Sequence, residues 1–251
     1  MYKKDVVIDA DHILFFVTES NIYKSDFKTS KKKKGFVGKV KKNKIDLKPY
    51  KKHFKLIIQD YVLTAEVESI CYDYELGKTR VILSDWTNFR YDIFPNYKSG
   101  RSEKKGVLKK LKAWAMKKYS FVKNCEADEI CAYYVKKGGI GFSTDKDIIK
   151  GVGGYWFNTH YKHQCWVRTS SKDAKNFMLE QCIAGDATDG IKGIPRIGHI
   201  KAKQLLNKFG WSFEGVIKAY ESKGLTEKDA VLTYNLVNME IWTPKIGVVL
   251  L

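Results

Sequence analysis

The chain has 251 residues, of which 44% are hydrophobic, enough for one sizeable domain or for one domain with a helical extension. With 46 Lys and Arg against 28 Asp and Glu, its formal net charge of +18 favours a polyanionic partner, above all nucleic acid, over a basic protein that is merely soluble. Five cysteines without a C-x-x-C pair argue against a zinc site or a disulfide framework and for reduced thiols in the cytoplasm, and apolar runs of strand length predict neither a signal peptide nor a membrane span.

The first predicted strand, V-V-I at residues 6–8, ends directly in carboxylates. Asp9 follows the apolar run at once, and Asp11 comes two residues later. A carboxylate at the end of a buried strand is unfavourable unless it is paired, hydrogen-bonded or bound to a metal ion. Asp9 is therefore a candidate metal ligand or, equally, a helix N-cap, whereas Asp11 is more typical of a cap or of a group that supports the site.

A lysine-rich segment, residues 24–55, comes next and includes four consecutive lysines at 31–34. Glycine and proline interrupt it, so we expect a solvated loop or ribbon. The composition fits a solvated charged face and a phosphate-contacting surface equally well. From residue 54 to residue 74 apolar residues recur with a helical period, which predicts a helix that faces the core.

The second predicted strand, residues 81–83, again ends in an acid, Asp85. Basic and aromatic residues are interleaved in the segment that follows. Cations contact phosphates and aromatic rings stack on bases, so this pattern suits a nucleic-acid strand. An amphipathic helix with Leu108, Leu111 and Trp114 on one face comes next, and we favour a strand-guiding arm over a plain surface helix. The candidate contacts are Asn88, Arg90, Tyr91, Tyr97, Lys98, Arg101, Lys104 and Lys105.

Residues 126–147 carry the densest group of acids. Three of them stand at the start of a predicted helix that two glycines end at residues 138–139. A short apolar strand at 140–142 follows, with two more acids just after it. Open α/β sheets place their sites at the carboxyl ends of strands, so this segment delivers several carboxylates to one region. The five acids are Glu126, Asp128, Glu129, Asp145 and Asp147.

Two further acids, Asp186 and Asp189, stand three residues apart, a spacing that lets both face one ion. So many like charges share a site only with polyvalent cations. One Mg²⁺ takes only one or two carboxylates directly, so the number of acids predicts two ions, which would clamp the attacking and leaving oxygens of a phosphodiester. The combined set is Asp9, Asp85, Glu126, Asp128, Asp145, Asp147, Asp186 and Asp189.

G-I-P-R-I-G at residues 193–198 is typical of a helix–hairpin–helix turn that binds a duplex backbone. We expect the backbone amides around Gly193, Ile194 and Gly198 to approach a phosphate, and the helix that follows to favour the anion. Lys201 and Lys203 add positive charge. The alternative is an ordinary Gly/Pro connection between helices.

Six blocks of this sequence resemble the 5′-nuclease superfamily, which includes flap endonucleases and the 5′-nuclease domains of bacterial DNA polymerase I. They are most similar to stand-alone bacteriophage 5′→3′ exonucleases of the T7 type. The blocks follow the family's order and span nearly the whole chain, and residues 235–244 resemble the family's closing stretch. They are I-D-A-D at 8–11, S-D-W-T-N-F-R at 84–90, P-N-Y-K-S-G-R at 95–101, C-E-A-D-E at 125–129, S-T-D-K-D at 143–147 and G-D-A-T-D-G-I-K-G-I-P-R-I-G at 185–198.

The resemblance implies an α/β domain at residues 1–178, with a central, mostly parallel sheet flanked by helices and a helical arch at about 86–121. A helix–hairpin–helix duplex-binding lobe and a tail would occupy 179–251. The implied activity is metal-dependent 5′→3′ exonuclease or 5′-flap endonuclease cleavage of DNA in phage replication, primer removal or DNA degradation, extending to RNA in RNA–DNA hybrids. The implied cofactors are two Mg²⁺ ions, replaceable by Mn²⁺, and K⁺ at the hairpin. The protein would act as a cytoplasmic monomer alongside replication proteins.

The resemblance also implies roles for single residues. Lys98 would stabilise charge on the scissile phosphate, acting with the catalytic acids Asp9, Asp85 and Asp145. Tyr97 would stack near the terminal base, and Arg101 would contact phosphate. One metal would be surrounded by Asp9, Asp85, Glu126, Asp128 and Asp145, and the second by Asp147, Asp186 and Asp189, with Asp145 shared.

Two departures from the family pattern stand out. The usual E-A-D-D is here E-A-D-E, so Glu129 is a longer candidate ligand. The lysine-rich insert before Lys55 has no role that can be carried over from the family. Two other functions remain open. A PIN-type endoribonuclease would lack the hairpin, so Gly198→Asp would leave its activity intact. A non-catalytic DNA-binding module would bind duplex DNA without Mg²⁺-dependent cleavage.

Overall fold

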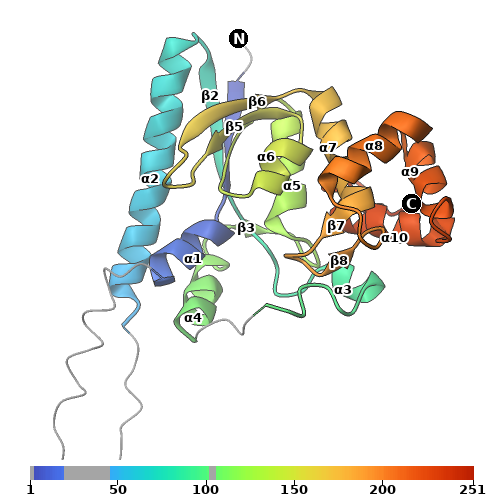
Figure 1. The fold of residues 1–251 in the computed structure, drawn as a ribbon. Helices are drawn as coiled ribbons and strands as arrows, with labels where there is room; N and C mark the ends of the chain where they lie inside the picture. The colour runs from blue at the N-terminus through green and yellow to red at the C-terminus, as the bar shows by residue number, and fades with distance from the viewer. Residues whose placement is uncertain (1–2, 20–45, 102–105) are drawn as a thin grey trace, which may run out of the picture.

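The centre of the molecule is a six-stranded sheet in a computed structural model that describes residues 3–19, 46–101 and 106–251 (Figure 1). Its spatial order is β3-β2-β1-β4-β5-β6, and every neighbouring pair is parallel except β5 with β6. This confirms the mostly parallel sheet that the sequence predicts. The strands are β1 Lys3–Asp9, β2 Glu75–Leu83, β3 Ser120–Phe121, β4 Ile140–Ser143, β5 Gly154–Asn158 and β6 Cys165–Thr169.

Strand β1 lies in the middle of the sheet because its apolar run is buried on both faces, as is usual for parallel strands. Ile8, fully buried, pairs with Val81 of β2 on one side and with Phe142 of β4 on the other. These strands run in the same direction, so their carboxyl ends meet at one edge. The acids that follow β1, β2 and β4 are therefore delivered to the same place.

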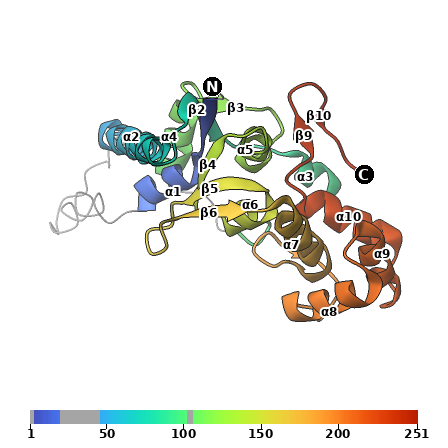
Figure 2. The same ribbon diagram turned by 90° about the horizontal axis from the view of Figure 1, so that it is seen from above.

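Helices cover both faces of the sheet, as Figure 2 shows from above. One face packs against α1, α2 and α4, and its core includes Ile8 and Phe142. The other packs against α5, α6 and a terminal hairpin, and its core includes Val7 and Trp156. The bounds are α1 Asp11–Glu19, α2 Lys48–Cys71, α4 Gly106–Ala115, α5 Ala127–Lys136 and α6 Lys146–Gly151, with the hairpin formed by β9 Trp242–Thr243 and β10 Gly247–Val248.

Helix α2 begins earlier than the sequence predicts. Residues 48–55 belong to the predicted lysine-rich loop, yet they form the first two turns of α2. The correction has a physical reason. Pro49 lies in the first turn, where its missing N–H costs nothing, and Tyr50 and Phe54 are buried against the core. The rest of the predicted loop, residues 24–45, lies outside the described residues.

The C-terminal part is a cluster of helices beside the sheet (Figures 1 and 2). It has an apolar core of its own, to which Cys182, Leu206 and Tyr220 contribute. The predicted boundary after residue 178 falls inside the continuous helix α7, so we place the division before that helix. The tail ends in the two-stranded hairpin of β9 and β10. The elements are α7 Ser171–Ala184, α8 His199–Phe209, α9 Phe213–Glu221 and α10 Glu227–Val237, with a small hairpin of β7 Gly185–Asp186 and β8 Ile191–Lys192 and, before α4, the short helix α3 Phe89–Ile93.

None of the helices in the described part of the chain has the combination of length and apolar character needed to cross a bilayer.

The turn after α7 depends on a glycine, which gives a first prediction. Gly185 has φ 74° and ψ −174°, a region open essentially to glycine alone, and a Cβ there would lie 2.3 Å from the backbone nitrogen of Gly193. We expect Gly185→Ala to lower the free energy of unfolding by about 3 kcal/mol. Gly224 has the same φ of 74° but open space around it, so Gly224→Ala should lose only about 1 kcal/mol. Urea denaturation of both variants measures the difference, and equal losses would contradict the role of the close approach.

Candidate active site

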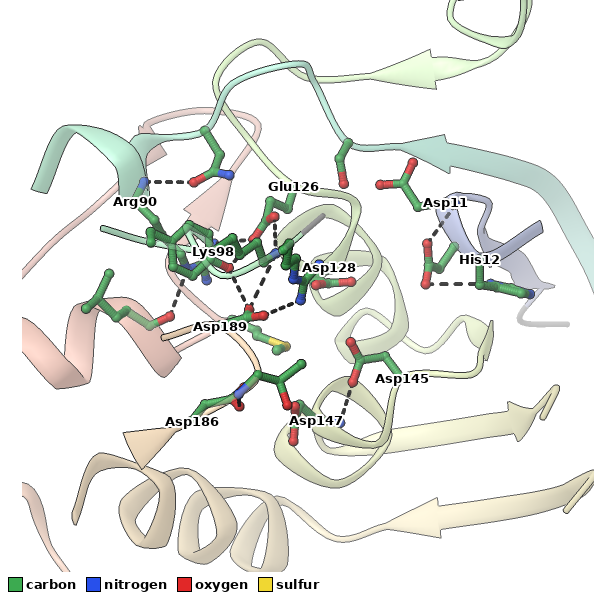
Figure 3. A pocket seen from close by; sticks show the side chains of 18 of the residues that line it. Asp11, His12, Arg90, Lys98, Glu126, Asp128, Asp145, Asp147, Asp186 and Asp189 are labelled. Atoms are coloured by element: carbon green, nitrogen blue, oxygen red, sulfur yellow. Dashed lines mark hydrogen bonds and ion pairs between the residues drawn. The ribbon is translucent and has the colours of Figure 1, made fainter. Parts of the chain in front are cut away.

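A cavity of about 640 Å³ opens where the carboxyl ends of β1, β2 and β4 meet the C-terminal helices. Figure 3 shows Glu126, Lys98 and Asp189 grouped on one side of it and Asp11 with His12 on the other. The structure brings eight of the nine predicted metal-binding acids to this cavity and adds Asp11, while Glu129 does not line it. The acids that line the cavity are Asp9, Asp11, Asp85, Glu126, Asp128, Asp145, Asp147, Asp186 and Asp189.

Asp9 is held at the end of β1 by three neighbours. Its Oδ1 accepts a hydrogen bond from the backbone nitrogen of Asp11 at 3.1 Å, and its Oδ2 accepts one from Ser143 Oγ on the adjacent strand β4 at 2.9 Å. His12 Nδ1 lies 3.7 Å from the same Oδ2. Burial works to raise the pKa of Asp9, but His12 and Ser143 outweigh it and hold the pKa below its ordinary value. Asp9 therefore stays a carboxylate although it is buried.

Asp85 and Asp145 follow β2 and β4, and each carboxylate accepts a hydrogen bond from a backbone nitrogen. Asp85 Oδ2 accepts from the backbone nitrogen of Asn124 at 2.9 Å. Asp145 caps α6 by accepting from the backbone nitrogen of Asp147 at 2.8 Å. Asp147 Oδ1 in turn accepts from Gln181 Nε2 on α7 at 2.9 Å. A carboxylate at the end of a strand can therefore cap a helix and bind a metal ion at the same time, because capping uses only some of its oxygen lone pairs.

Arg90 and Glu129 are buried partners, whereas the sequence predicts a nucleic-acid contact and a metal ligand. The Arg90 side chain is 2% exposed and donates to Glu126 and Glu129 and to the carbonyl oxygen of Leu236. Glu129, with no exposed surface, also accepts from the backbone nitrogen of Glu126 at 2.8 Å. Arg90 borders the cavity but is buried and paired, an arrangement that does not favour the predicted nucleic-acid contact, and Glu129 does not line the cavity.

Tyr97 is also buried, against the prediction that it stacks near a terminal base. It is 3% exposed, and its hydroxyl lies 2.8 Å from Glu126 Oε2 and 2.9 Å from Asp189 Oδ2. Lys98 bridges the same two acids, with Nζ 2.5 Å from Glu126 Oε1 and 3.4 Å from Asp189 Oδ2, and Arg101 also pairs with Asp189. Tyr97 therefore holds the acids through its hydroxyl, and Lys98 and Arg101 line the cavity, while their predicted contacts with phosphate stay predictions.

Some of the carboxylates in the cavity are paired with basic side chains, and others are not. Burial would raise the pKa of Glu126, but Lys98 and Arg90 lower it to about 2. Asp128 is the opposite case, because burial and then the carboxylates of Asp145 and Asp9 raise its pKa well above the ordinary value. The unpaired acids repel one another, and a divalent cation would relieve that repulsion.

Within the described ranges, no three carboxylate, imidazole or thiolate side chains converge closely enough to enclose a metal ion by themselves. The residues nevertheless fit hydrated Mg²⁺. Their donors are carboxylate oxygens, the ligands this ion prefers, and Mg²⁺ keeps several waters while taking one or two carboxylates directly.

The cavity's acids give a second prediction, for pH dependence. Burial, followed by the carboxylates of Asp145 and Asp186, raises the pKa of Asp147 from 3.8 to about 6. Between these values the folded protein holds a proton that the unfolded chain has released, so this stabilising contribution is present in acid and is lost as the pH rises through about 6. In EDTA, the stability of wild type relative to Asp147→Asn should fall from pH 4.5 to pH 7.5. Urea denaturation at each pH measures it, and parallel curves would contradict the assignment.

Part of the predicted duplex-binding turn makes contacts within the protein and is not available to DNA. The backbone nitrogen of Ile194 donates to the carbonyl oxygen of Ile183 at 2.8 Å, and the Ile194 side chain is 3% exposed. A Cβ on Gly193 would lie 2.3 Å from that same carbonyl oxygen, so Gly193 is needed for packing. Gly198 faces open space just before α8, and Lys201 and Lys203 are exposed on that helix. The predicted contacts Lys104 and Lys105 lie outside the described residues.

Sequence reasoning missed several residues that shape the site. Ser143 and Gln181 orient Asp9 and Asp147, and Lys112 and Trp86 line the cavity near Asp85. Ser143 is the first residue of the S-T-D-K-D block, so its position could have indicated its role. Gln181 gave no such signal, because its partner lies 34 positions away in the chain.

The chain is similar in sequence to curated proteins with related names. It is 30% identical over 160 residues to a "5'-3' exonuclease" of Mycoplasmopsis pulmonis, a match that covers 56% of this chain and 53% of that protein. It is 26% identical over 188 residues to a "Flap endonuclease" of Escherichia phage T5, covering 62% and 64%. The chain thus spans between about half and two thirds of the length of these relatives. No protein-family model matches it.

The fold is also that of solved structures. A structure described as divalent metal ions (zinc) bound to the T5 5′-exonuclease covers 95% of this chain and 90% of its own, with a TM-score of 0.59 and 17% identity. A T5 flap endonuclease in complex with DNA and metal ions gives the same TM-score, identity and coverage. The α/β architecture predicted from the sequence blocks is therefore confirmed.

Proposed function

We propose that this chain, a relative of 5′-nucleases in sequence and fold, hydrolyses phosphodiesters at the 5′ ends and 5′ flaps of duplex DNA. One observation carries the proposal: strand-end acids and the basic side chains of Lys98 and Arg101 meet in a single cavity. Acids suit cations, and basic side chains suit the phosphates of the substrate. The proteins it resembles carry the names 5′-3′ exonuclease and flap endonuclease, which agrees with this chemistry.

The acids would hold two divalent cations, Mg²⁺ with Mn²⁺ able to replace it. When bound, such ions stabilise charge on the attacking and leaving oxygens and supply a nucleophilic water. Neighbours in fold are described as binding divalent metal ions, including zinc, which supports a metal requirement. One ion would lie among Asp9, Asp85, Glu126, Asp128 and Asp145, and the other among Asp145, Asp147, Asp186 and Asp189.

The chain's own residues would bind and orient the substrate. Lys98 carries an ammonium group whose pKa is raised, because Glu126 and Asp189 outweigh the effect of burial, so it stays positive across the neutral range. Its left-handed backbone, φ 56°, is fixed by a hydrogen bond from its nitrogen to the carbonyl oxygen of Asp189 at 2.8 Å. A charge held this firmly would meet a phosphate without reorganising, which is the requirement for stabilising a charged transition state.

The duplex would lie across the C-terminal helices. Gly198 and the N-terminus of α8 face open space, and Lys201 and Lys203 project from the same helix, a combination that suits a phosphate backbone. We also propose that K⁺ binds at this turn and that the RNA of RNA–DNA hybrids is a further substrate. The protein would act as a cytoplasmic monomer together with replication proteins. The T5 relative described with DNA supports the DNA part of it.

A cleavage assay tests the function. A blunt duplex and a 5′-flapped duplex, each labelled at the 5′ end, would be incubated with Mg²⁺ or with EDTA, using wild type and Asp145→Ala. We expect labelled mononucleotides or short flap fragments with wild type and Mg²⁺ only. Intact substrates together with retained duplex binding would contradict the proposal and indicate a DNA-binding module. Internal cleavage of single-stranded RNA that survives Gly198→Asp would instead indicate an endoribonuclease.

A further inference from the structure

Trp86 is a large aromatic side chain left half in water at the edge of the acid cavity. It is 49% exposed and lines the cavity, one residue after Asp85. Burying an indole is strongly favourable, so a tryptophan exposed at a cavity mouth is either unpartnered surface or the contact point for a ligand. Its position beside a candidate metal-binding acid favours the second.

The segment that carries Trp86 is held in place from several sides. The backbone nitrogen of Trp86 donates to Asp85 Oδ1 at 2.7 Å, and the backbone nitrogen of Asp85 donates to the carbonyl oxygen of Cys125 at 2.9 Å. Lys112 Nζ donates to the carbonyl oxygen of Asp85 at 3.2 Å. The backbone beneath the ring is therefore fixed, and less ordering is needed when a ligand meets the ring.

Lys112 places a buried positive charge next to the indole. Its side chain is 3% exposed, and its Nζ lies 5.2 Å from the centre of the Trp86 ring and 3.8 Å from Asp11 Oδ1. An ammonium at this distance attracts the electron-rich face of an indole and restrains the ring. The ring is thus supported by the protein on one side while about half of its surface remains in solvent.

We propose that Trp86 stacks on a nucleobase next to the phosphodiester that the cavity would cleave. Every base has a π-face, so such a contact works at any sequence, which suits an enzyme that follows a strand. The proposal rests on the proposed 5′-nuclease function. It assigns to Trp86 the stacking role that the resemblance implies for Tyr97, which is 3% exposed.

The test measures binding in EDTA, where no hydrolysis is expected, with a fluorescein-labelled duplex that carries a 5′ flap. Trp86→Ala should weaken binding about tenfold, whereas Trp86→Phe should weaken it far less because a ring remains. Removing the base at the flap junction should weaken binding by wild type to a similar extent. Combining the abasic flap with Trp86→Ala should then weaken binding little further, because both changes remove the same contact.

Tyr72→Ala is the matched control. Tyr72 is 67% exposed and lies just beyond the last turn of α2, at the opposite edge of the sheet, so its loss should leave the dissociation constant unchanged. Melting temperatures of all variants show whether each one folds. The stacking role would be overturned if wild type and Trp86→Ala bound with equal affinity, or if the effects of the variant and the abasic site were additive. Cleavage by wild type would be intact in either case. Absence of cleavage by wild type would instead contradict the proposed function.

Discussion

Replacing Asp128 by Asn is expected to reduce hydrolysis about a thousandfold while making the metal-free protein more stable. A divalent cation contributes several kcal/mol to charge stabilisation in such sites, and each 1.36 kcal/mol changes the rate tenfold. Burial and the nearby carboxylates of Asp145 and Asp9 raise the pKa of Asp128 far above normal, so its negative charge is unfavourable in the metal-free protein. An uncharged amide of the same shape removes that repulsion.

The opposite signs of the two effects make the Asp128 experiment decisive. In EDTA the melting temperature of Asp128→Asn should rise by about 2–4 °C, the shift expected for about 1 kcal/mol in a chain of this size. Added Mg²⁺ should stabilise wild type more than the variant. Asp60→Asn, on the exposed face of α2, is the matched control and should change neither rate nor stability. An Asp128→Asn protein that melts lower in EDTA would contradict the repulsion on which the metal site is argued.

Replacing Arg90 by Met is expected to cause the largest loss of stability, about 3–5 kcal/mol, because it leaves buried carboxylates without their partner. Arg90 is 2% exposed and pairs with Glu126 and Glu129. Arg90 also donates hydrogen bonds to the carbonyl oxygens of Leu236 and Asn238, at the C-terminal end of α10. Urea denaturation in EDTA gives the free energy of unfolding.

The double variant Arg90→Met with Glu129→Leu is the control for the Arg90 prediction. Replacing a buried ion pair by apolar side chains is often close to neutral, so the second change should restore much of the lost stability. Arg90→Lys should not, since a single ammonium group cannot reach both acids and both carbonyls. A single Arg90→Met variant as stable as wild type would show that the buried pairing contributes little.

The sheet was predictable because its signal is local. The run of residues 6–8 is apolar without interruption, which is typical of a strand buried on both faces, and it forms the centre of the sheet. The start of α2 was not predictable from charge, because Lys48, Lys52 and Lys55 are exposed while Tyr50 and Phe54 pack inward. A lysine-rich stretch can therefore be a helix with one buried face.

The convergence of Asp9, Asp85, Glu126, Asp128, Asp145 and Asp147 was predictable for the same reason, since each ends or follows a strand or stands at the start of a helix. Their role as metal ligands stays a prediction, as does the narrower likeness to T7-type exonucleases. The buried positions of Arg90 and Tyr97 have one cause. Arg90 meets Leu236 from 146 positions away, and Tyr97 meets Asp189 from 92. Pairing at such separations leaves no local pattern, so a buried arginine and an exposed one look alike in the sequence.

The most direct test of the central claim is to locate Mn²⁺ by its anomalous X-ray scattering in crystals of the wild-type protein. We expect two peaks inside the acid cavity, one towards Asp9, Asp85 and Asp128 and one towards Asp147 and Asp186. Crystals of Asp145→Asn, grown in the same way, should lose at least one of them. A cavity without Mn²⁺ in crystals that bind the ion elsewhere would contradict the claim that these acids form a metal-dependent catalytic centre.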